Sequence, residues 1–182
     1  ILAGAGSGKT RVITRRIAHL IAARGVHAAD VLAITFTNKA AGEMRERCAS
    51  LGVPTGAWIS TFHATCARIL RRDIESLGGY TRDFTIYDSA DQQSVVKQLV
   101  KEYGLDDTTY QARMVLGRIS HAKNRMEGPE TFDTPWNPRD REIGRLYAGY
   151  QKALTEASAL DFDDLLLKTV ELVETSQQVR EF

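Results

Sequence analysis

The chain opens on a glycine-rich loop that constrains its fold more than any other feature. The loop runs from Ala3 to Thr10 with the sequence Ala-Gly-Ala-Gly-Ser-Gly-Lys-Thr, after two apolar residues typical of a strand end and before a helical pattern. This order is typical of a phosphate-binding loop, because small residues let backbone N–H groups turn toward an anion and the helix dipole points at the same place. The strict motif has glycine where this chain has Ala3, a position that needs a small side chain. An ordinary glycine-rich turn is the alternative.

The loop supplies the first candidate site residues. The small residues of the loop are expected to surround the phosphates of a nucleoside triphosphate, and these residues are Ala3, Gly4, Ala5, Gly6, Ser7 and Gly8. Lys9 is expected to reach the β- and γ-phosphates, and the Thr10 hydroxyl is expected to bind Mg²⁺. Lys9 and Thr10 are therefore the candidate catalytic residues, and Thr10 is the candidate metal ligand.

Length and composition indicate a soluble globular protein. The 182 residues can form one substantial core, or a core with an inserted subdomain. No apolar run is long enough to span a membrane, and the chain start does not resemble a signal peptide. Cys48 and Cys66 have no metal-binding spacing, so both are predicted to be reduced core residues of a cytoplasmic protein.

The net charge of +1 conceals an asymmetry along the chain. Residues 1–87 carry 12 Lys and Arg against 6 Asp and Glu, whereas residues 88–182 carry 12 against 17. The first half is therefore the better candidate for anion binding. One basic stretch in the second half, which contains Arg113, Arg118, His121, Lys123 and Arg125, is either a binding face or a solvated helix surface.

Hydrophobic periodicity predicts an α/β fold with a parallel sheet flanked by helices. The predicted helices cover residues 10–23, 39–51 and 62–77, and the apolar residues that follow helical spacing in the first are Val12, Ile13, Ile17, Leu20 and Ile21. Short apolar strands are predicted at residues 31–36, 58–60 and 84–87. Strands that alternate with helices in this way are typical of a parallel sheet.

The alternation of strands and helices stops after residue 88. A capping box at Ser89–Gln92 predicts a helix start, and further helices are predicted at residues 110–123 and around Ile143–Leu154, with no strand evident between 89 and 155. Asp161 is predicted to cap a last helix. We therefore expect a first part of an α/β domain at 1–88, an all-helical insertion at 89–155 and a return into the first domain at 156–182.

Two segments follow predicted strands in the manner of ligand-binding loops. Phe36, Thr37 and Asn38 lie at the carboxyl end of one strand, and Thr61 and His63 follow the next. Ligands bind at this edge of open α/β sheets, where an aromatic ring beside hydroxyl and amide groups suits a stacked base with a phosphate nearby. The alternatives are that Phe36 and Phe62 are core residues and that Thr37 only caps a helix.

Taken together, these segments resemble the superfamily 1 DNA helicases of the UvrD/PcrA/Rep group. Ala3–Thr10 is similar to motif I of that family, Ala33–Arg45 to motif Ia and Ser60–Arg71 to motif Ib. Asp161–Leu166 resembles the segment that re-enters the first motor domain, called 1A, and Ile119–Asn124 resembles part of the inserted 1B subdomain.

The resemblance implies a RecA-like P-loop fold, with ATP and Mg²⁺ as cofactors and single-stranded and partly duplex DNA as partner. Arg11 would lie against the adenine ring, and Phe36, Thr37, Asn38, Thr61 and His63 would line the path of single-stranded DNA. Arg118 and Lys123, within the basic stretch, would face the duplex or the entering strand. The implied reaction is ATP hydrolysis coupled to 3′→5′ translocation and strand separation.

Several parts of that family's enzyme are not in these 182 residues: the Asp-Glu motif, the adenine-reading glutamine and the second motor domain. We therefore expect the 182-residue chain alone to be inactive. Asp161, Asp163 and Asp164 are poor substitutes for the Asp-Glu motif, because they begin an apolar helical stripe rather than end a strand. A non-catalytic nucleotide- or DNA-binding module, a helicase–nuclease subunit and a small-molecule phosphotransferase are the alternatives.

Overall fold

The computed structural model describes residues 8–134 and 136–181, and the chain divides into two compact units, residues 1–65 and 66–182. Separate hydrophobic clusters lie within the units, one in the first and two in the second. Of the phosphate-binding loop, only Gly8, Lys9 and Thr10 fall within the described residues.

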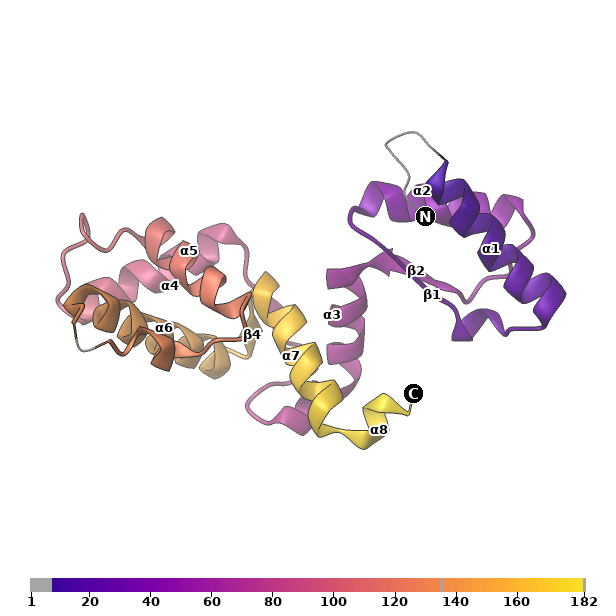
Figure 1. The fold of residues 1–182 in the computed structure, drawn as a ribbon. Coiled ribbons are helices and arrows are strands. Elements are labelled where there is room, and N and C mark those ends of the chain that lie inside the picture. Colours follow the sequence, from indigo (N-terminus) through magenta and orange to yellow (C-terminus); the bar gives the residue numbers. More distant parts are fainter. Residues whose placement is uncertain (1–7, 135, 182) are drawn as a thin grey trace. The chain divides into compact units, whose positions relative to one another are not determined.

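The first unit contains a strand–helix–strand motif (Figure 1). Strand β1 (Leu32–Thr35) runs parallel to β2 (Trp58–Thr61), and helix α2 (Asn38–Ser50) connects them. Helix α1 (Lys9–Arg24) and the 3₁₀ turn η1 (Ala28–Asp30) precede the motif. The two strands are in register from Leu32 opposite Trp58 to Thr35 opposite Thr61, so both end at the same edge.

The core of the first unit takes up only some of the apolar residues of α1. Ile17 packs with Met44 and Cys48 of α2 and with the strands, whereas Val12 and Ile13 are 60% and 45% exposed. Thr14 takes the inward position instead, because its hydroxyl donates to the Arg11 carbonyl at 3.1 Å and is thereby satisfied while buried. Of the apolar residues at helical spacing, Ile17 and Ile21 pack into the core, whereas Val12 and Ile13 lie outside the buried face of α1.

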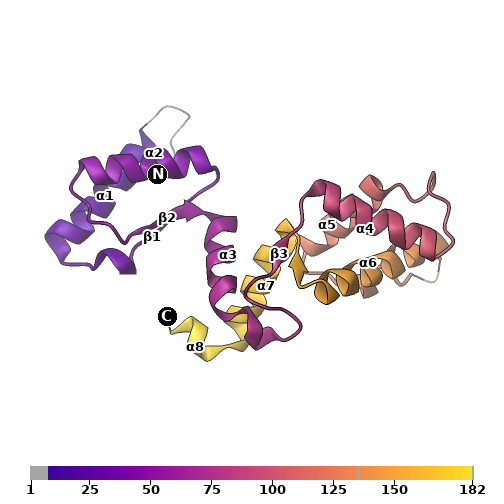
Figure 2. The same cartoon turned by 180° about the vertical axis from the view of Figure 1, so that it is seen from behind.

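The second unit contains three helices that share one core. These are α4 (Ser89–Glu102), α5 (Ala112–Lys123) and α6 (Pro138–Glu156), which lie side by side in Figure 2. The 3₁₀ turn η3 (Pro129–Phe132) packs against α6. The fully buried side chains of this core include Val96, Val115, Ile143, Leu146 and Tyr150.

The second unit also holds a separate pair of short parallel strands. Strand β3 (Thr85–Ile86) pairs with β4 (Ala159–Leu160). Hydrophobic periodicity did not predict β4, because two residues are too few to show a pattern. The sequence predicted one parallel sheet, but the described residues form two separate parallel pairs.

The remaining elements of the second unit pack around that strand pair. Helix α3 (Phe62–Asp73) runs on from the first unit, and the 3₁₀ turn η2 (Ile74–Leu77) follows it. Helices α7 (Phe162–Thr175) and α8 (Gln177–Arg180) complete the chain. Leu70, Ile74, Phe84, Leu160, Leu165 and Leu172 form a second buried cluster there.

The start of α4 differs from the predicted capping box by one residue. Asp88, rather than Ser89, is the N-cap, and its carboxylate accepts from the amides of Ala90 and Asp91 at 2.7 and 3.0 Å. The Asp91 carboxylate accepts from the Asp88 amide in return. A charged carboxylate is a stronger acceptor than a serine hydroxyl, and the backbone bonds, chiefly from Asp91, lower the pKa of Asp88.

Candidate phosphate-binding and nucleic-acid interface

The beginning of α1 carries the described part of the phosphate-binding loop. Gly8 is the N-cap with φ of 82°, a left-handed conformation that glycine adopts without strain, and no side chain caps the helix. Lys9 is exposed and Thr10 is half-buried in the first turn. Because Gly8 brings no side chain to the first-turn amides, the N-terminus of this 16-residue helix is suited to bind an anion.

Most of the other predicted nucleotide-binding positions precede the first described residue. Ala3, Gly4, Ala5, Gly6 and Ser7 lie outside the described residues, so their predicted contacts stay predictions. Arg11 is exposed on the first turn of α1. Its proposed stacking on a base is not tested by the geometry.

An aromatic pair lies at the shared carboxyl edge of β1 and β2. Phe36 follows β1 and Phe62 follows β2, and their ring centroids are 6.1 Å apart with an angle of 49° between the planes. Phe36 is 93% exposed and Phe62 is 46% exposed, so neither is a core residue. The pair presents an aromatic surface of the kind on which nucleic-acid bases stack.

Phe62 was not among the predicted site residues, although a signal for it existed. Ser-Thr-Phe-His places Phe62 directly after β2, just as Phe36 comes directly after β1. Since the two parallel strands end together, the two rings had to be neighbours.

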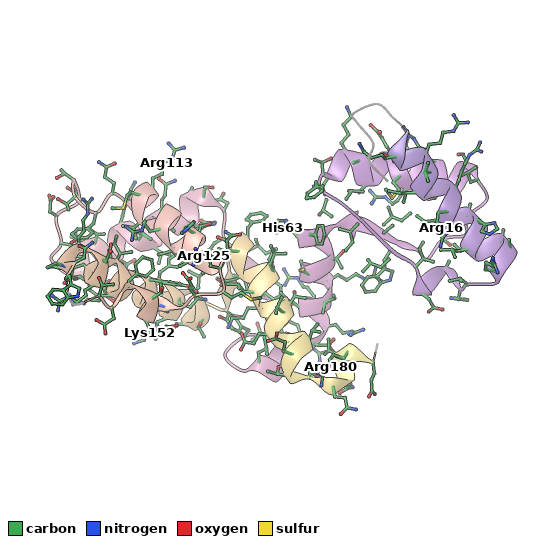
Figure 3. The ribbon with its side chains drawn as sticks, in the orientation of Figure 1. Arg16, His63, Arg113, Arg125, Lys152 and Arg180 are labelled. Atoms are coloured by element: carbon green, nitrogen blue, oxygen red, sulfur yellow. The ribbon has the colours of Figure 1, made fainter. Side chains whose placement is uncertain are left out.

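The hydroxyl groups beside the aromatic pair have local structural partners. Thr37 is the N-cap of α2, where its Oγ1 accepts from the Ala40 amide at 3.1 Å. Thr37 is exposed, and its own O–H proton can still be donated to an external acceptor. Asn38 and His63 are also exposed, and Figure 3 shows His63 at the start of α3.

Thr61 does not have the role that the sequence suggested. Thr61 is only 8% exposed, and its Oγ1 accepts a hydrogen bond from the Ala64 amide at 3.3 Å at the start of α3. The structure therefore gives Thr61 a capping role, and direct donation from its hydroxyl to a phosphate is not supported.

A second tether fixes β2 beneath this edge. Arg45 of α2 donates to the Ile59 carbonyl at 2.7 Å, and Ser60 and Thr65 hydroxyls lie 2.6 Å apart. These bonds hold α2, β2 and the start of α3 in a fixed arrangement, which positions the aromatic pair.

The structure contradicts the prediction that Lys123 contacts DNA. Its side chain is 1% exposed, and its Nζ lies 2.7 Å from an Asp161 oxygen and 2.8 Å from an Asp164 oxygen. Tyr150 donates its hydroxyl proton to the Asp161 oxygen at 3.0 Å. The prediction failed because the two buried carboxylates hold the lysine in the core. The distribution of charge along the sequence does not reveal this burial.

Burial dominates the electrostatics of this cluster, which we call the Lys123 cluster (Lys123, Tyr150, Asp161 and Asp164). Burial raises the pKa of Asp164, the Lys123 charge opposes that rise, and the nearby Asp161 charge adds to it. Burial and the Asp161 charge also raise the pKa of Tyr150. Asp161 also caps α7 with a capping box, which confirms that these acids begin a helix.

The rest of the basic stretch lies at or near the surface. Arg118 pairs with Asp140 at 2.9 Å and its guanidinium lies 5.2 Å from the Phe132 ring centroid. Arg125 pairs with Glu127 at 2.7 Å, while Arg113 is exposed at the start of α5, as Figure 3 shows. Arg118 thus remains a candidate for DNA contact with a competing internal partner.

Residues 8–134 and 136–181 contain no cluster of three or more His, Cys, Asp and Glu side chains able to hold a metal ion. None of their helices is long and apolar enough to cross a bilayer. Cys48 and Cys66 are both free thiols, and burial raises the pKa of Cys48.

Comparison with known proteins decides the family. A model of the UvrD/REP helicase N-terminal domain matches residues 1–182. The chain belongs to the UvrD/REP helicase N-terminal domain family. The resemblance drawn from motifs I, Ia and Ib is thereby confirmed.

Several proteins similar to this chain bear the name of ATP-dependent DNA helicases. The chain is 50% identical over 186 aligned residues to the ATP-dependent DNA helicase PcrA of Bacillus subtilis, and 46% identical over 188 to the ATP-dependent DNA helicase UvrD1 of Mycobacterium leprae. PcrA of Staphylococcus aureus is 45% identical over 185. Each comparison covers 100% of this chain but only 25%, 24% and 25% of the relative, so the chain spans about a quarter of their length.

Proposed function

We propose that the protein containing this chain is an ATP-dependent DNA helicase that hydrolyses ATP while it moves on single-stranded DNA and separates duplexes. The observation that carries the proposal is the exposed Phe36–Phe62 pair at the carboxyl edge of β1 and β2. The names of the relatives, ATP-dependent DNA helicases PcrA and UvrD1, support it. A 3′→5′ direction follows from the resemblance in motifs.

In this proposal the start of α1 binds ATP. Lys9 neutralises charge on the β- and γ-phosphates, and the Thr10 hydroxyl binds Mg²⁺. Gly8 and the loop before it offer amides to the phosphates, and Arg11 lies against the adenine. Mg²⁺ supplies charge neutralisation between the phosphates when it is bound. The exposed position of Lys9 at the start of α1 and the left-handed glycine before it support this assignment.

The DNA path in this proposal follows the strand ends. Bases stack on Phe36 and Phe62. The residues that directly follow these two rings contact the backbone phosphates, and they are Thr37, Asn38 and His63. The side chain of Thr61 is excluded from the path because it is buried. Arg118 stays a proposed contact to partly duplex DNA, whereas the buried Lys123 is no longer among the proposed DNA contacts.

The proposed architecture is a RecA-like motor domain 1A at residues 1–88 and 156–182 with a 1B insertion at 89–155. The shared core of α4, α5 and α6 supports a helical insertion of about that extent. The α1 start, the β1–α2–β2 motif and the parallel register support a P-loop sheet.

The proposal is tested by ATP hydrolysis of the full-length protein with and without single-stranded DNA. Strong stimulation by DNA is expected, because the path at the strand ends and the nucleotide share one sheet edge. DNA binding without turnover would favour a non-catalytic module. Turnover that ignores DNA would overturn the assignment of Phe36 and Phe62.

Replacing Phe36 with alanine in the full-length protein is expected to weaken binding of single-stranded DNA about 10-fold, because one stacked base contributes about 1–3 kcal/mol. ATP hydrolysis without DNA should stay within about twofold, since the proposal assigns Phe36 to the DNA and not to the nucleotide. Fluorescence anisotropy with a labelled oligothymidylate measures the first quantity.

The matched control is Trp136→Ala, which removes another highly exposed aromatic ring, 92% exposed, from the segment before α6. It should leave oligothymidylate binding unchanged. Equal losses for both variants would show that Phe36 contributes only general surface stickiness.

A further inference from the structure

A groove between α4 and α5 is not used by the proposed helicase function. Its main cavity has a volume of about 730 Å³ and lies over the C-terminal half of α4, the following loop and the start of α5. A second cavity of about 630 Å³ shares Gln93 and Arg113 with it and continues along the same two helices to Phe162. We call the two together the α4–α5 groove.

The floor of the α4–α5 groove is apolar. Val100, Leu105, Tyr110 and Ala112 line the main cavity. Leu105 and Tyr110 are only partly buried against the helical core, so they keep surface that a ligand can cover. A partner with apolar side chains gains free energy by covering that surface.

Three cations line the main cavity without an internal partner. Lys97 and Lys101 lie one turn apart on α4, and Arg113 projects from α5. Within residues 8–134 and 136–181, none of the three makes a salt bridge or side-chain hydrogen bond, unlike Arg118, Arg125 and Arg145 nearby. Their charges are therefore available to anionic groups of a ligand.

Two carboxylates lie at one end of the same cavity. Asp106 accepts from the hydroxyl and amide of both Thr108 and Thr109, and these bonds, first that of the Thr109 hydroxyl, lower the pKa of Asp106 to about 2. Asp107 lies next to it in the lining. Asp106 is therefore charged at neutral pH, and this acidic end of the cavity repels phosphates.

The lining of the main cavity thus contains three kinds of surface: an apolar floor, a group of cations and an acidic end. A nucleic-acid strand carries phosphate at every nucleotide and would place some beside Asp106 and Asp107. A peptide can instead place apolar side chains on the floor, carboxylates beside the cations and a basic residue beside the two aspartates. Charge complementarity therefore favours a peptide over DNA.

We propose that the α4–α5 groove docks an acidic amphipathic peptide segment of a partner protein. The apolar side chains of the peptide cover Val100, Leu105 and Tyr110, and its carboxylates pair with Lys97, Lys101 and Arg113. This site is separate from the ATP and DNA sites of the proposed function and does not depend on them.

The test uses the full-length protein and a fluorescein-labelled peptide of about 12 residues, with leucines at helical spacing, glutamates beside them and one terminal lysine. Binding is measured by anisotropy at low salt. The Lys97→Glu/Lys101→Glu variant should weaken binding at least about 10-fold, because two favourable charge pairs become repulsive.

The control variant is Lys152→Glu, which reverses an exposed charge on α6 outside the groove. It should leave peptide affinity within about twofold, because Lys152 pairs with Glu156 on α6 and does not line the groove. DNA-stimulated ATP hydrolysis should be unchanged in both variants, which separates this site from the helicase site.

Two results would overturn the proposal. One is absence of peptide binding to the full-length protein, or a lack of specificity in that binding. Specificity is lacking if a scrambled peptide and the designed peptide have the same affinity, and if Lys152→Glu weakens binding as much as Lys97→Glu/Lys101→Glu does. The other is loss of single-stranded or duplex DNA binding in Lys97→Glu/Lys101→Glu while peptide binding persists, which would make the groove a nucleic-acid site.

Discussion

Replacing Lys123 with methionine is expected to destabilise the unit at residues 66–182 by about 3–5 kcal/mol at pH 7, because removing one partner of a buried ion pair leaves charge uncompensated. Lys123 is 1% exposed, and its two partners Asp161 and Asp164 are 5% and 2% exposed in their side chains. Methionine preserves most of the side-chain volume, so the loss reports charge rather than a cavity. Urea unfolding followed by circular dichroism measures it.

The loss should depend on pH in a direction that the Lys123 cluster fixes. Burial already raises the pKa of Asp164, and the Lys123 charge opposes that rise. Without Lys123 the folded state holds a proton on Asp164 more tightly than the unfolded state does. Stability of the variant therefore falls as pH rises through the raised pKa, and its deficit relative to the wild type should be smaller at pH 5 than at pH 7 by about 1 kcal/mol or more.

A second substitution distinguishes charge imbalance from lost packing. Lys123→Met combined with Asp164→Asn removes one of the two stranded carboxylates, and about 2 kcal/mol should be recovered. The remaining Asp161 keeps the Tyr150 hydroxyl and the Asp164 amide as donors. Lys152→Met, at an exposed position of α6, should change stability by less than about 0.5 kcal/mol. A loss below about 1 kcal/mol for Lys123→Met would contradict the electrostatic account.

The Lys123 cluster also shows where sequence reasoning stops. The basic stretch was identified by charge along the chain, and charge does not distinguish a lysine on the surface from one buried beside two aspartates. The segment with Asp161 and Asp164 lies 38 or more residues beyond Lys123, so no local pattern connects them. Only the packing of α5 against α7 brings these residues together.

Local signals, in contrast, predicted local structure well. The helix start at Asp161 was predicted from its capping residue and is confirmed, and Thr37, one of the two candidate caps with Asn38, is the N-cap of α2. Strands β1 and β2 and helix α2 lie within two residues of their predicted bounds. Strand pairing was less predictable. Strand β3 lies within the strand predicted at residues 84–87, but the two residues of β4 carry no periodicity, and the pairing of β3 with β4 depends on the helices between them.

Replacing Lys9 with alanine in the full-length protein is expected to reduce ATP hydrolysis in the presence of DNA by at least about 100-fold, because a positioned donor on the transferring phosphoryl group contributes a large share of transition-state stabilisation. Lys9 is the first residue of α1, directly after the left-handed Gly8, and thus lies at the helix end where the helix dipole favours a bound anion. Steady-state phosphate release with saturating oligothymidylate measures the effect.

Two control variants show that the loss belongs to the phosphate site. Lys39→Ala removes another exposed lysine of the same unit, on α2, and should leave turnover within about threefold. Thr10→Ser keeps the hydroxyl that would bind Mg²⁺ and should stay active, whereas Thr10→Ala should raise the Mg²⁺ concentration needed for half-maximal turnover. If Lys9→Ala retained more than about a tenth of the activity, the catalytic contribution expected of this lysine would be absent and α1 would not begin at the nucleotide.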